Sequence, residues 1–103
     1  MSMIRACSYQ ATIQLPDAAA NYSAILVTVS QEDVQINKSK PELILNDNQV
    51  TIMLDQTETK QFVACKSAYL QIRCYKSQYE APGSKIWSIA VFPSLNEEVL
   101  PLS

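Results

Sequence analysis

The sequence predicts an all-β fold, an antiparallel immunoglobulin-like β-sandwich of about seven strands with one short helical turn near residues 55–62. Three observations lead to this prediction. Apolar and polar residues alternate with a period of two over most of the chain, as in half-buried strands. Turn-forming residues separate these stretches at intervals of about eight to twelve residues. No helical pattern of ten residues lies between the stretches, which argues against a parallel α/β sheet.

The length and composition are those of one small globular domain. The chain has 103 residues, of which 48% are hydrophobic and 17% are charged, and a chain of this size can bury one core. We predict a single sandwich domain over residues 1–95 and a C-terminal tail over residues 96–103. The apolar run at residues 24–27 is far shorter than the ~20 residues of a membrane span, and the first ten residues lack the apolar stretch of a secretory signal. We therefore expect a protein made in a cytoplasm, without a membrane partner.

The charged residues and the cysteines limit the kinds of binding and catalytic site that the chain can form. The net charge is -2 and the Lys and Arg residues are scattered, so no basic footprint for nucleic acid is visible. There is no His, and the three cysteines, Cys7, Cys65 and Cys74, have no C-x-x-C spacing. These facts exclude a zinc site built from Cys and His, and they exclude His-based catalysis. We expect reduced thiols, no cofactor and no metal.

The first half of the chain is predicted to form a series of short strands. Residues 9–15 alternate and end at the turn formers Pro16 and Asp17. Residues 25–30 and 34–36 alternate again, and residues 42–45 and 49–54 form a predicted hairpin about the turn signal at residues 46–48. The residues predicted to face the core in this half are Tyr9, Ala11, Ile13, Leu15, Ile25, Val27, Val29, Val34, Ile36, Val50, Ile52 and Leu54.

A polar passage interrupts the alternation at residues 55–62. Asp55 is a suitable N-cap, and Glu58 stands three residues later in the capping-box position. We expect one or two helical turns here, closed by Phe62 packing into the core. The strand that follows, residues 67–75, is the most regular in the chain. It is predicted to turn Ala68, Leu70, Ile72 and Cys74 to the core, and Tyr69, Gln71, Arg73 and Tyr75 outward.

The last predicted strand, residues 85–92, has two apolar faces. Ile86, Ser88, Ala90 and Phe92 lie opposite Trp87, Ile89 and Val91, so the strand is expected to be central or to lie under a partner. Trp87 is expected to pack in the core. Residues 76–85 form a predicted loop. In the tail, Leu95, Val99 and Leu100 are expected either to dock on the domain or to contact a neighbour.

The sequence contains no recognisable catalytic motif or group of catalytic residues. A single Gly cannot build a phosphate loop, and no G-x-S-x-G elbow is present. The acidic pairs at residues 32–33 and 97–98 point to opposite faces if they lie on strands, so neither forms an acid/base dyad. Cys74 behaves as a small apolar side chain on the inner face of its strand, and Cys65 beside Lys66 has no base to activate it. The sequence predicts no catalytic residue.

The outward face of residues 67–75 is the best candidate site. Three interpretations stay open. The face can be the solvent-exposed side of a sheet, or a surface on which nucleic-acid bases stack. It can also be a protein contact surface, since Tyr and Arg are enriched at interface hot spots. The acidic chain argues against nucleic acid. The candidate interface residues are Tyr69, Gln71, Arg73, Tyr75, Leu95, Val99 and Leu100.

Several segments in collinear order resemble small proteins of tailed bacteriophages of Gram-positive gut bacteria. They are MIR at residues 3–5, an alternating strand ending in LP at 15–16, ILVTVSQEDVQI at 25–36, NQVTIMLDQTETKQF at 48–62, AYLQIRCY at 68–75 and LNEEVL at 95–100. The strand and turn ending in LDQTETKQF are also similar to the N-terminal β-sandwich of phage baseplate upper proteins. The loop at residues 76–85 departs from this pattern.

The resemblance implies a non-enzymatic virion structural protein of the tail, baseplate, neck or capsid decoration. Its partners would be other virion proteins and copies of itself, joined by contacts that symmetry repeats. It would be made in the bacterial host cytoplasm and reside in the virion. The alternative is a cytoplasmic phage accessory protein that inhibits a host defence factor by binding its surface. An enzyme is the third class, and no residues support it.

Overall fold

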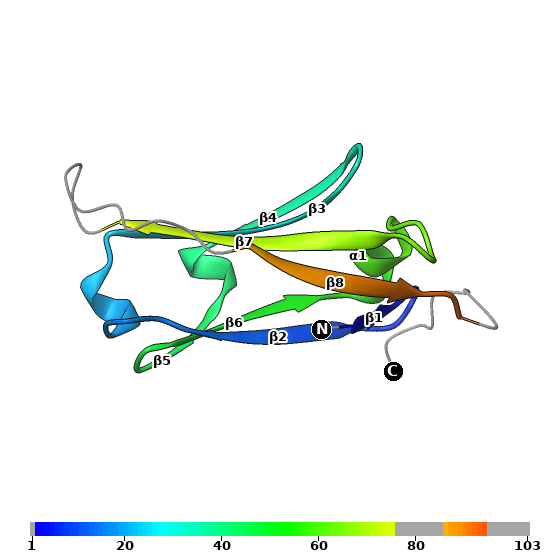
Figure 1. Ribbon diagram of the computed structural model, residues 1–103. Helices are drawn as coiled ribbons and strands as arrows, with labels where there is room; N and C mark the ends of the chain where they lie inside the picture. Colours follow the sequence, from blue (N-terminus) through cyan, green and yellow to red (C-terminus); the bar gives the residue numbers. More distant parts are fainter. Residues whose placement is uncertain (1, 76–85, 95–103) are drawn as a thin grey trace, which may run out of the picture.

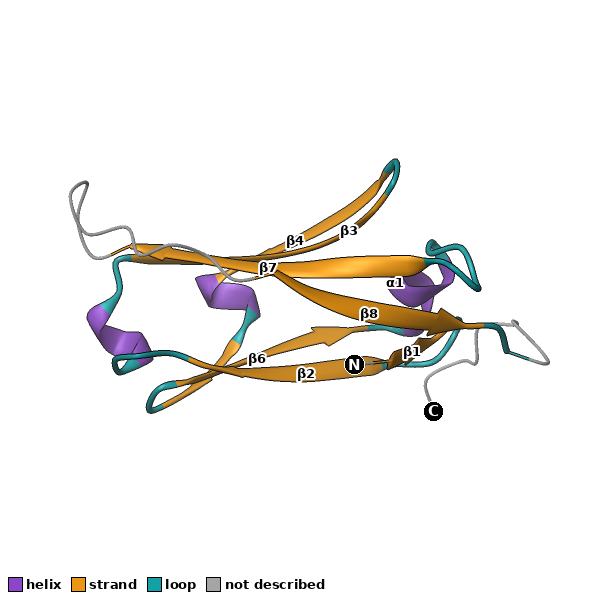
Figure 2. Cartoon of the chain, viewed as in Figure 1, coloured by secondary structure: helices purple, strands orange, loops and turns teal. Residues whose placement is uncertain are grey.

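Two β-sheets packed face to face make up the fold (Figures 1 and 2). The computed structural model describes residues 2–75 and 86–94. One sheet has five strands in the order β1-β8-β7-β3-β4, and the other has three in the order β2-β6-β5. The strands are β1 (Ser2–Ile4), β2 (Tyr9–Gln14), β3 (Ala24–Gln31), β4 (Val34–Ser39), β5 (Ile44–Asn46), β6 (Gln49–Leu54), β7 (Ser67–Tyr75) and β8 (Ile86–Phe92). Three short helices join them, η1 (Ala19–Asn21), η2 (Lys40–Glu42) and α1 (Gln56–Lys60).

The connectivity confirms the predicted immunoglobulin-like sandwich. In that fold, strands B, E and D belong to one sheet and strands C, F and G to the other. Here β2, β6 and β5 occupy the places of B, E and D, and β3, β7 and β8 occupy those of C, F and G. The chain has no disulfide between the sheets among the described residues, where all three cysteines are free. Packing of apolar side chains therefore holds the two layers together.

The structure adds one strand to the predicted antiparallel sandwich of about seven strands. The described residues contain eight strands, and the additional one, β1, runs parallel to β8, with Met3 opposite Val91. Met3 is only 1% exposed, so this short strand closes the core beside β8. A strand of three residues is too short to show a period-two pattern, and its partner lies almost ninety positions away in the sequence.

The core lies between the sheets and contains the side chains that the alternation assigned to it. Val27, Val29, Val50, Ile52 and Leu70 are completely buried. The two faces of β7 are as predicted, with Ala68, Leu70 and Ile72 buried and Tyr69 and Arg73 exposed. Tyr9, Val34, Cys74 and Trp87 are partly buried and pack against the same core cluster. Burial raises the pKa of the Cys74 thiol, which favours its protonated, unreactive form.

The segment around Pro41 corrects the predicted hairpin. Residues 42–45 were expected to be a strand, but η2 covers Lys40–Glu42 and β5 begins only at Ile44. Ser39 and Glu42 form a capping box: the Glu42 carboxylate accepts hydrogen bonds from the backbone N–H of Ser39 and from its hydroxyl, both at 3.1 Å. Pro41 also suits the first turn of a helix because it lacks an N–H. The turn at residues 46–48 is confirmed, with Asp47 at φ 52.

The polar passage after β6 is helical, as predicted. Asp55 caps α1 by accepting from the N–H of Glu58 at 2.8 Å, and Glu58 accepts from the N–H of Asp55 at 3.0 Å. The helix ends one turn later, and Phe62 is completely buried. α1 lies at one end of the sandwich, near the start of β7 (Figure 1). Burial of Phe62 thus ties the crossover from one sheet to the other onto the core.

Glu58 also joins α1 to the edge strand β4. The Lys38 ammonium lies 2.7 Å from the second carboxylate oxygen of Glu58, and both side chains are only about one fifth exposed, at 18% and 21%. Lys38 lies on the inner face of β4, opposite Val27. The hydrogen bond to Glu58 raises the pKa of Lys38 above its ordinary value. The Glu58 carboxylate therefore accepts a backbone hydrogen bond at the start of α1 and also neutralises the inward-pointing Lys38.

This pair predicts a pH-dependent contribution to stability. Because the pKa of Lys38 is raised in the folded state, the contribution is fully present below the unfolded pKa, about 10.4. It is lost as pH rises through the folded pKa. Glu58→Gln removes the ion pair and keeps an oxygen to accept from the Asp55 N–H. We expect the wild-type protein to melt at a higher temperature than Glu58→Gln at pH 8, and the difference to shrink between about pH 10 and pH 12.

Thermal unfolding of both proteins across this pH range measures the effect. The matched control is Lys60→Met, which removes an exposed lysine from the same helix and is expected to leave the pH profile unchanged. A melting-temperature difference between wild type and Glu58→Gln that stays constant up to pH 12 would contradict a role for the Lys38 charge.

A buried glutamine organises the connection between α1 and β7. Gln31 is the last residue of β3 and is 3% exposed. Its amide nitrogen donates to the carbonyls of Val63 at 2.9 Å and Lys66 at 3.2 Å, and its amide oxygen accepts from the Val63 N–H at 2.5 Å. One side chain thereby holds both ends of the turn at residues 63–66, which delivers the chain into β7.

Candidate protein-contact face

Three of the predicted site residues lie together on the outer face of the five-stranded sheet. Tyr69 is 50% exposed, Arg73 is exposed and Gln71 is half-buried between them. They share this face because they occupy alternate positions of one strand. Tyr75 is the last residue of β7. Leu95, Val99 and Leu100 lie outside the described residues.

The strand register adds apolar side chains that the sequence analysis did not select. Tyr69 lies opposite Ser88 of β8, and Gln71 lies opposite Ile86. Ile86 is 60% exposed and Phe92 is 50% exposed. Across the next gap, Ile4 of β1 lies opposite Phe92 and is 49% exposed. We call this set, Ile4, Tyr69, Ile86 and Phe92, the apolar face.

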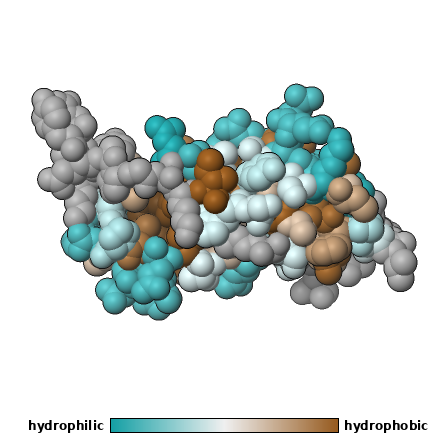
Figure 3. Space-filling view, in the orientation of Figure 1, coloured by the Kyte–Doolittle hydropathy of each residue, from teal (hydrophilic) through white to brown (hydrophobic). Residues whose placement is uncertain are grey.

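The apolar face follows β8 toward its end beside β1. The space-filling view shows brown and pale brown surface at that end, next to teal regions (Figure 3). Half-exposed side chains of this size together leave roughly 400 Å² of apolar surface in contact with water. This surface is distributed along β8 from Ile86 to Phe92, with Ser88 and Ala90 between them. Exposed apolar surface that is gathered on one face often marks a contact site.

The same sheet face is almost free of charge. Among the outward positions of its described strands, Arg73 is the only residue that carries a formal charge. Depletion of charge, together with Tyr, Phe and Arg, is typical of the centre of a protein interface. The outward positions are Ser2, Ile4, Ala24, Leu26, Thr28, Ser30, Gln35, Asn37, Ser39, Ser67, Tyr69, Gln71, Arg73, Ile86, Ser88, Ala90 and Phe92.

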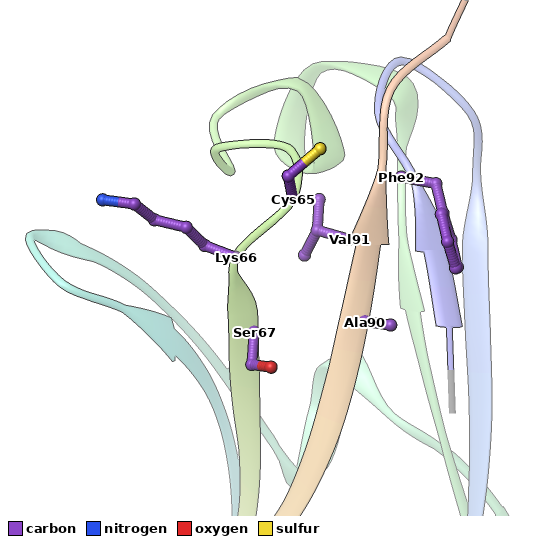
Figure 4. Close-up of a pocket in the computed structure, with 6 residues that line it drawn as sticks. All are labelled: Cys65, Lys66, Ser67, Ala90, Val91 and Phe92. Atoms are coloured by element: carbon purple, nitrogen blue, oxygen red, sulfur yellow. The ribbon is translucent and has the colours of Figure 1, made fainter.

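A small hollow of about 230 Å³ lies at the end of this face. Its lining combines the start of β7 with the end of β8 and includes Cys65, Ser67, Ala90 and Phe92 (Figure 4). The N–H of Cys65 donates to the carbonyl of Val91 at 2.9 Å, which holds the turn against β8. The hollow is large enough for one apolar side chain of a partner.

The two titratable side chains that line the hollow, Cys65 and Lys66, point in different directions (Figure 4). Lys66 points away from Cys65 and Phe92 (Figure 4) and pairs with Glu32 at 2.8 Å. Cys65 is exposed, and no group of three or more His, Cys, Asp or Glu residues that could hold a metal ion occurs in residues 2–75 and 86–94. In this part of the chain the longest helix has five residues, so none is long enough to cross a membrane.

A signal for the missed residues was present in the sequence. Residues 86–92 are apolar on both faces, a pattern that predicts either a central strand or a strand that lies under a partner. β8 lies between β7 and β1, which confirms a place inside the sheet, yet Ile86 and Phe92 still face outward. Only the pairing of β8 with β7 shows which of its two apolar faces is exposed.

Comparisons with known proteins give no family for this chain. No protein-family model matches it, and no curated protein matches it.

Proposed function

We propose that this protein is a non-enzymatic structural component of a bacteriophage particle that works through protein–protein contacts. The observation that carries the contact role is the apolar face, on a sheet whose described outward residues include one formal charge, that of Arg73. The phage setting, whether tail, baseplate, neck or capsid decoration, depends on the resemblance of the sequence segments described above. The proposal includes residence in the virion after synthesis in the host cytoplasm.

The chemistry of the face suggests what its partner looks like. A complementary surface would be largely uncharged, because burying unpaired charges against apolar groups is costly. It would place one apolar side chain in the hollow beside Phe92 and one carboxylate near Arg73, since Arg pairs well with carboxylates. A neighbouring structural protein of the particle fits this description, and repetition by symmetry would turn a small contact into stable attachment.

Substitution of the apolar face in the phage tests the proposal. We expect wild-type chain to be present in purified particles, and Ile86→Ser/Phe92→Ser to reduce its amount at least tenfold, as measured by quantitative mass spectrometry. The matched control is Ile44→Ser/Met53→Ser, which changes two side chains of the other sheet with similar exposure, 53% and 50% against 60% for Ile86 and 50% for Phe92. The control is expected to keep the wild-type amount.

Two outcomes would contradict the proposal: one concerns the structural role, the other the surface that makes the contact. Absence of the wild-type chain from purified particles would overturn the structural role. Its presence with no loss in the Ile86→Ser/Phe92→Ser particles would overturn the apolar face as the contact. Thermal unfolding of the purified variants checks that both double substitutions leave the fold intact, as expected for exposed positions.

A further inference from the structure

The edge strands of the two sheets differ in how they are protected. The described sheets have four edges, formed by β1 and β4 in one sheet and β2 and β5 in the other. An edge strand presents unpaired N–H and C=O groups to which another chain can pair, and natural proteins blunt such edges with short strands, inward charges, Pro or bulges. The four edges can be compared on these features.

Three of the four edges carry such a feature. β1 and β5 have only three residues each. β4 has the inward-pointing Lys38, whose ammonium pairs with Glu58. β2 has none of them: its six residues, YQATIQ, include no charge, no Pro and no Gly, and all six pair with β6 without a bulge.

The backbone groups on the open side of β2 can be assigned. The N–H of Leu15 donates to the carbonyl of Asn48 at 2.6 Å and so continues the ladder toward β6. In an antiparallel pair, residues alternate between bonding one neighbour and facing the other side. Tyr9, Ala11 and Ile13 therefore bond β6. Gln10, Thr12 and Gln14 direct their N–H and C=O groups to the opposite side, where no described strand pairs with them.

We propose that two copies of this chain join edge to edge along β2, antiparallel about a two-fold axis at Thr12. In this register Thr12 pairs with the partner's Thr12, and Gln10 pairs with the partner's Gln14. Each of these pairs can exchange two backbone hydrogen bonds. The two three-stranded sheets become one continuous sheet of six strands.

The sequence of β2 makes a second copy the fitting partner. Its outward residues read Gln-Thr-Gln in both directions about Thr12, so the strand is complementary to itself. The register keeps outward residues opposite outward residues, as a continuous sheet requires. On the inner face Ala11 meets the partner's Ile13, which extends the core. The Thr12 hydroxyl already bonds that of Thr51 at 2.9 Å, and no residue of β2 carries a charge.

This inference rests on the proposed function, because a symmetric assembly requires contacts between copies of the same chain. It adds to that function by naming a second copy as a partner. The structural evidence for it is the β2 edge, which belongs to the sheet opposite the apolar face. The two can therefore fail separately.

Charge substitutions at the axis test the dimer. Thr12→Lys places two lysines directly opposite each other, and like charges at such a pair are destabilising. We expect analytical ultracentrifugation to show a concentration-dependent dimer for the full wild-type chain and at least a tenfold weaker dimer for Thr12→Lys and for Thr12→Glu. An equal mixture of the two variants is expected to restore pairing.

The matched control is Thr51→Lys. It loses the same hydroxyl–hydroxyl bond and adds the same charge to the same sheet face, but it lies one strand away from the edge. It is expected to dimerise like wild type, and so is Ile86→Ser/Phe92→Ser. Amide hydrogen exchange gives a second readout: the amides of Gln10, Thr12 and Gln14 should become protected as concentration rises, whereas those of Ala11 and Ile13 are protected throughout.

Several results would overturn the inference. A wild-type chain that stays monomeric up to about 1 mM would do so. So would equal loss of the dimer in Thr51→Lys and Thr12→Lys, or a mixture of Thr12→Lys and Thr12→Glu that fails to pair. Loss of the dimer only in Ile86→Ser/Phe92→Ser would place self-association on the apolar face instead.

Discussion

Replacing Phe62 with alanine is expected to lower the free energy of unfolding by about 3–5 kcal/mol. Phe62 is completely buried between the sheets, directly after α1. Its removal loses the transfer free energy of the ring and leaves a cavity that the surrounding strands can fill only in part. It also releases the apolar contact that fastens the crossover between β6 and β7 to the core. Urea denaturation of the purified protein measures the change.

The matched control is Phe92→Ala, which removes the only other phenylalanine of the chain. Phe92 is 50% exposed on the apolar face, and its replacement is expected to cost less than about 1 kcal/mol. Losses of similar size in the two variants would mean that Phe92 packs in the core and that the apolar face is wrongly assigned.

Replacing Gln31 with alanine is expected to lower the free energy of unfolding by about 2–4 kcal/mol. The side chain makes three hydrogen bonds to the turn at residues 63–66. Removing it leaves the Val63 N–H and two carbonyls without this partner in a part-buried site, and each buried polar group left unsatisfied costs about 1–3 kcal/mol. The turn would loosen, because this one amide holds both of its ends.

Gln31→Met separates the hydrogen bonds from the packing. Methionine nearly fills the same volume but offers no amide, so we expect most of the loss to remain, together with faster hydrogen exchange of the Val63 amide. The control Gln35→Ala removes an exposed glutamine of β4 and is expected to cost less than about 0.5 kcal/mol. Full stability in Gln31→Met would show that Gln31 acts through its volume alone.

The candidate site was predictable in part. The outward direction of Tyr69, Gln71 and Arg73 followed from strict alternation in one strand, because inward neighbours such as Leu70 and Ile72 are unmistakably apolar. The contribution of Ile86 and Phe92 did not follow, because residues 86–92 are apolar on both faces. Which face of β8 is exposed to solvent depends on its register with β7. That register is set by contacts between separate strands and cannot be read from residues 86–92 alone. Gln31 could have been suspected, since it continues the inward positions Ile25, Val27 and Val29.

The sequence by itself determined the class of fold, the inward side of most strands and the helical turn after β6. These features depend on local spacing: a period of two, a turn former between strands, and Asp55 three residues before Glu58. The tertiary structure alone decided that β1 lies parallel to β8, that Lys38 reaches Glu58 and that β2 is left as an unprotected edge. Each of these depends on which distant segments become neighbours, and that choice is made by burial of the whole core, to which every strand contributes at once.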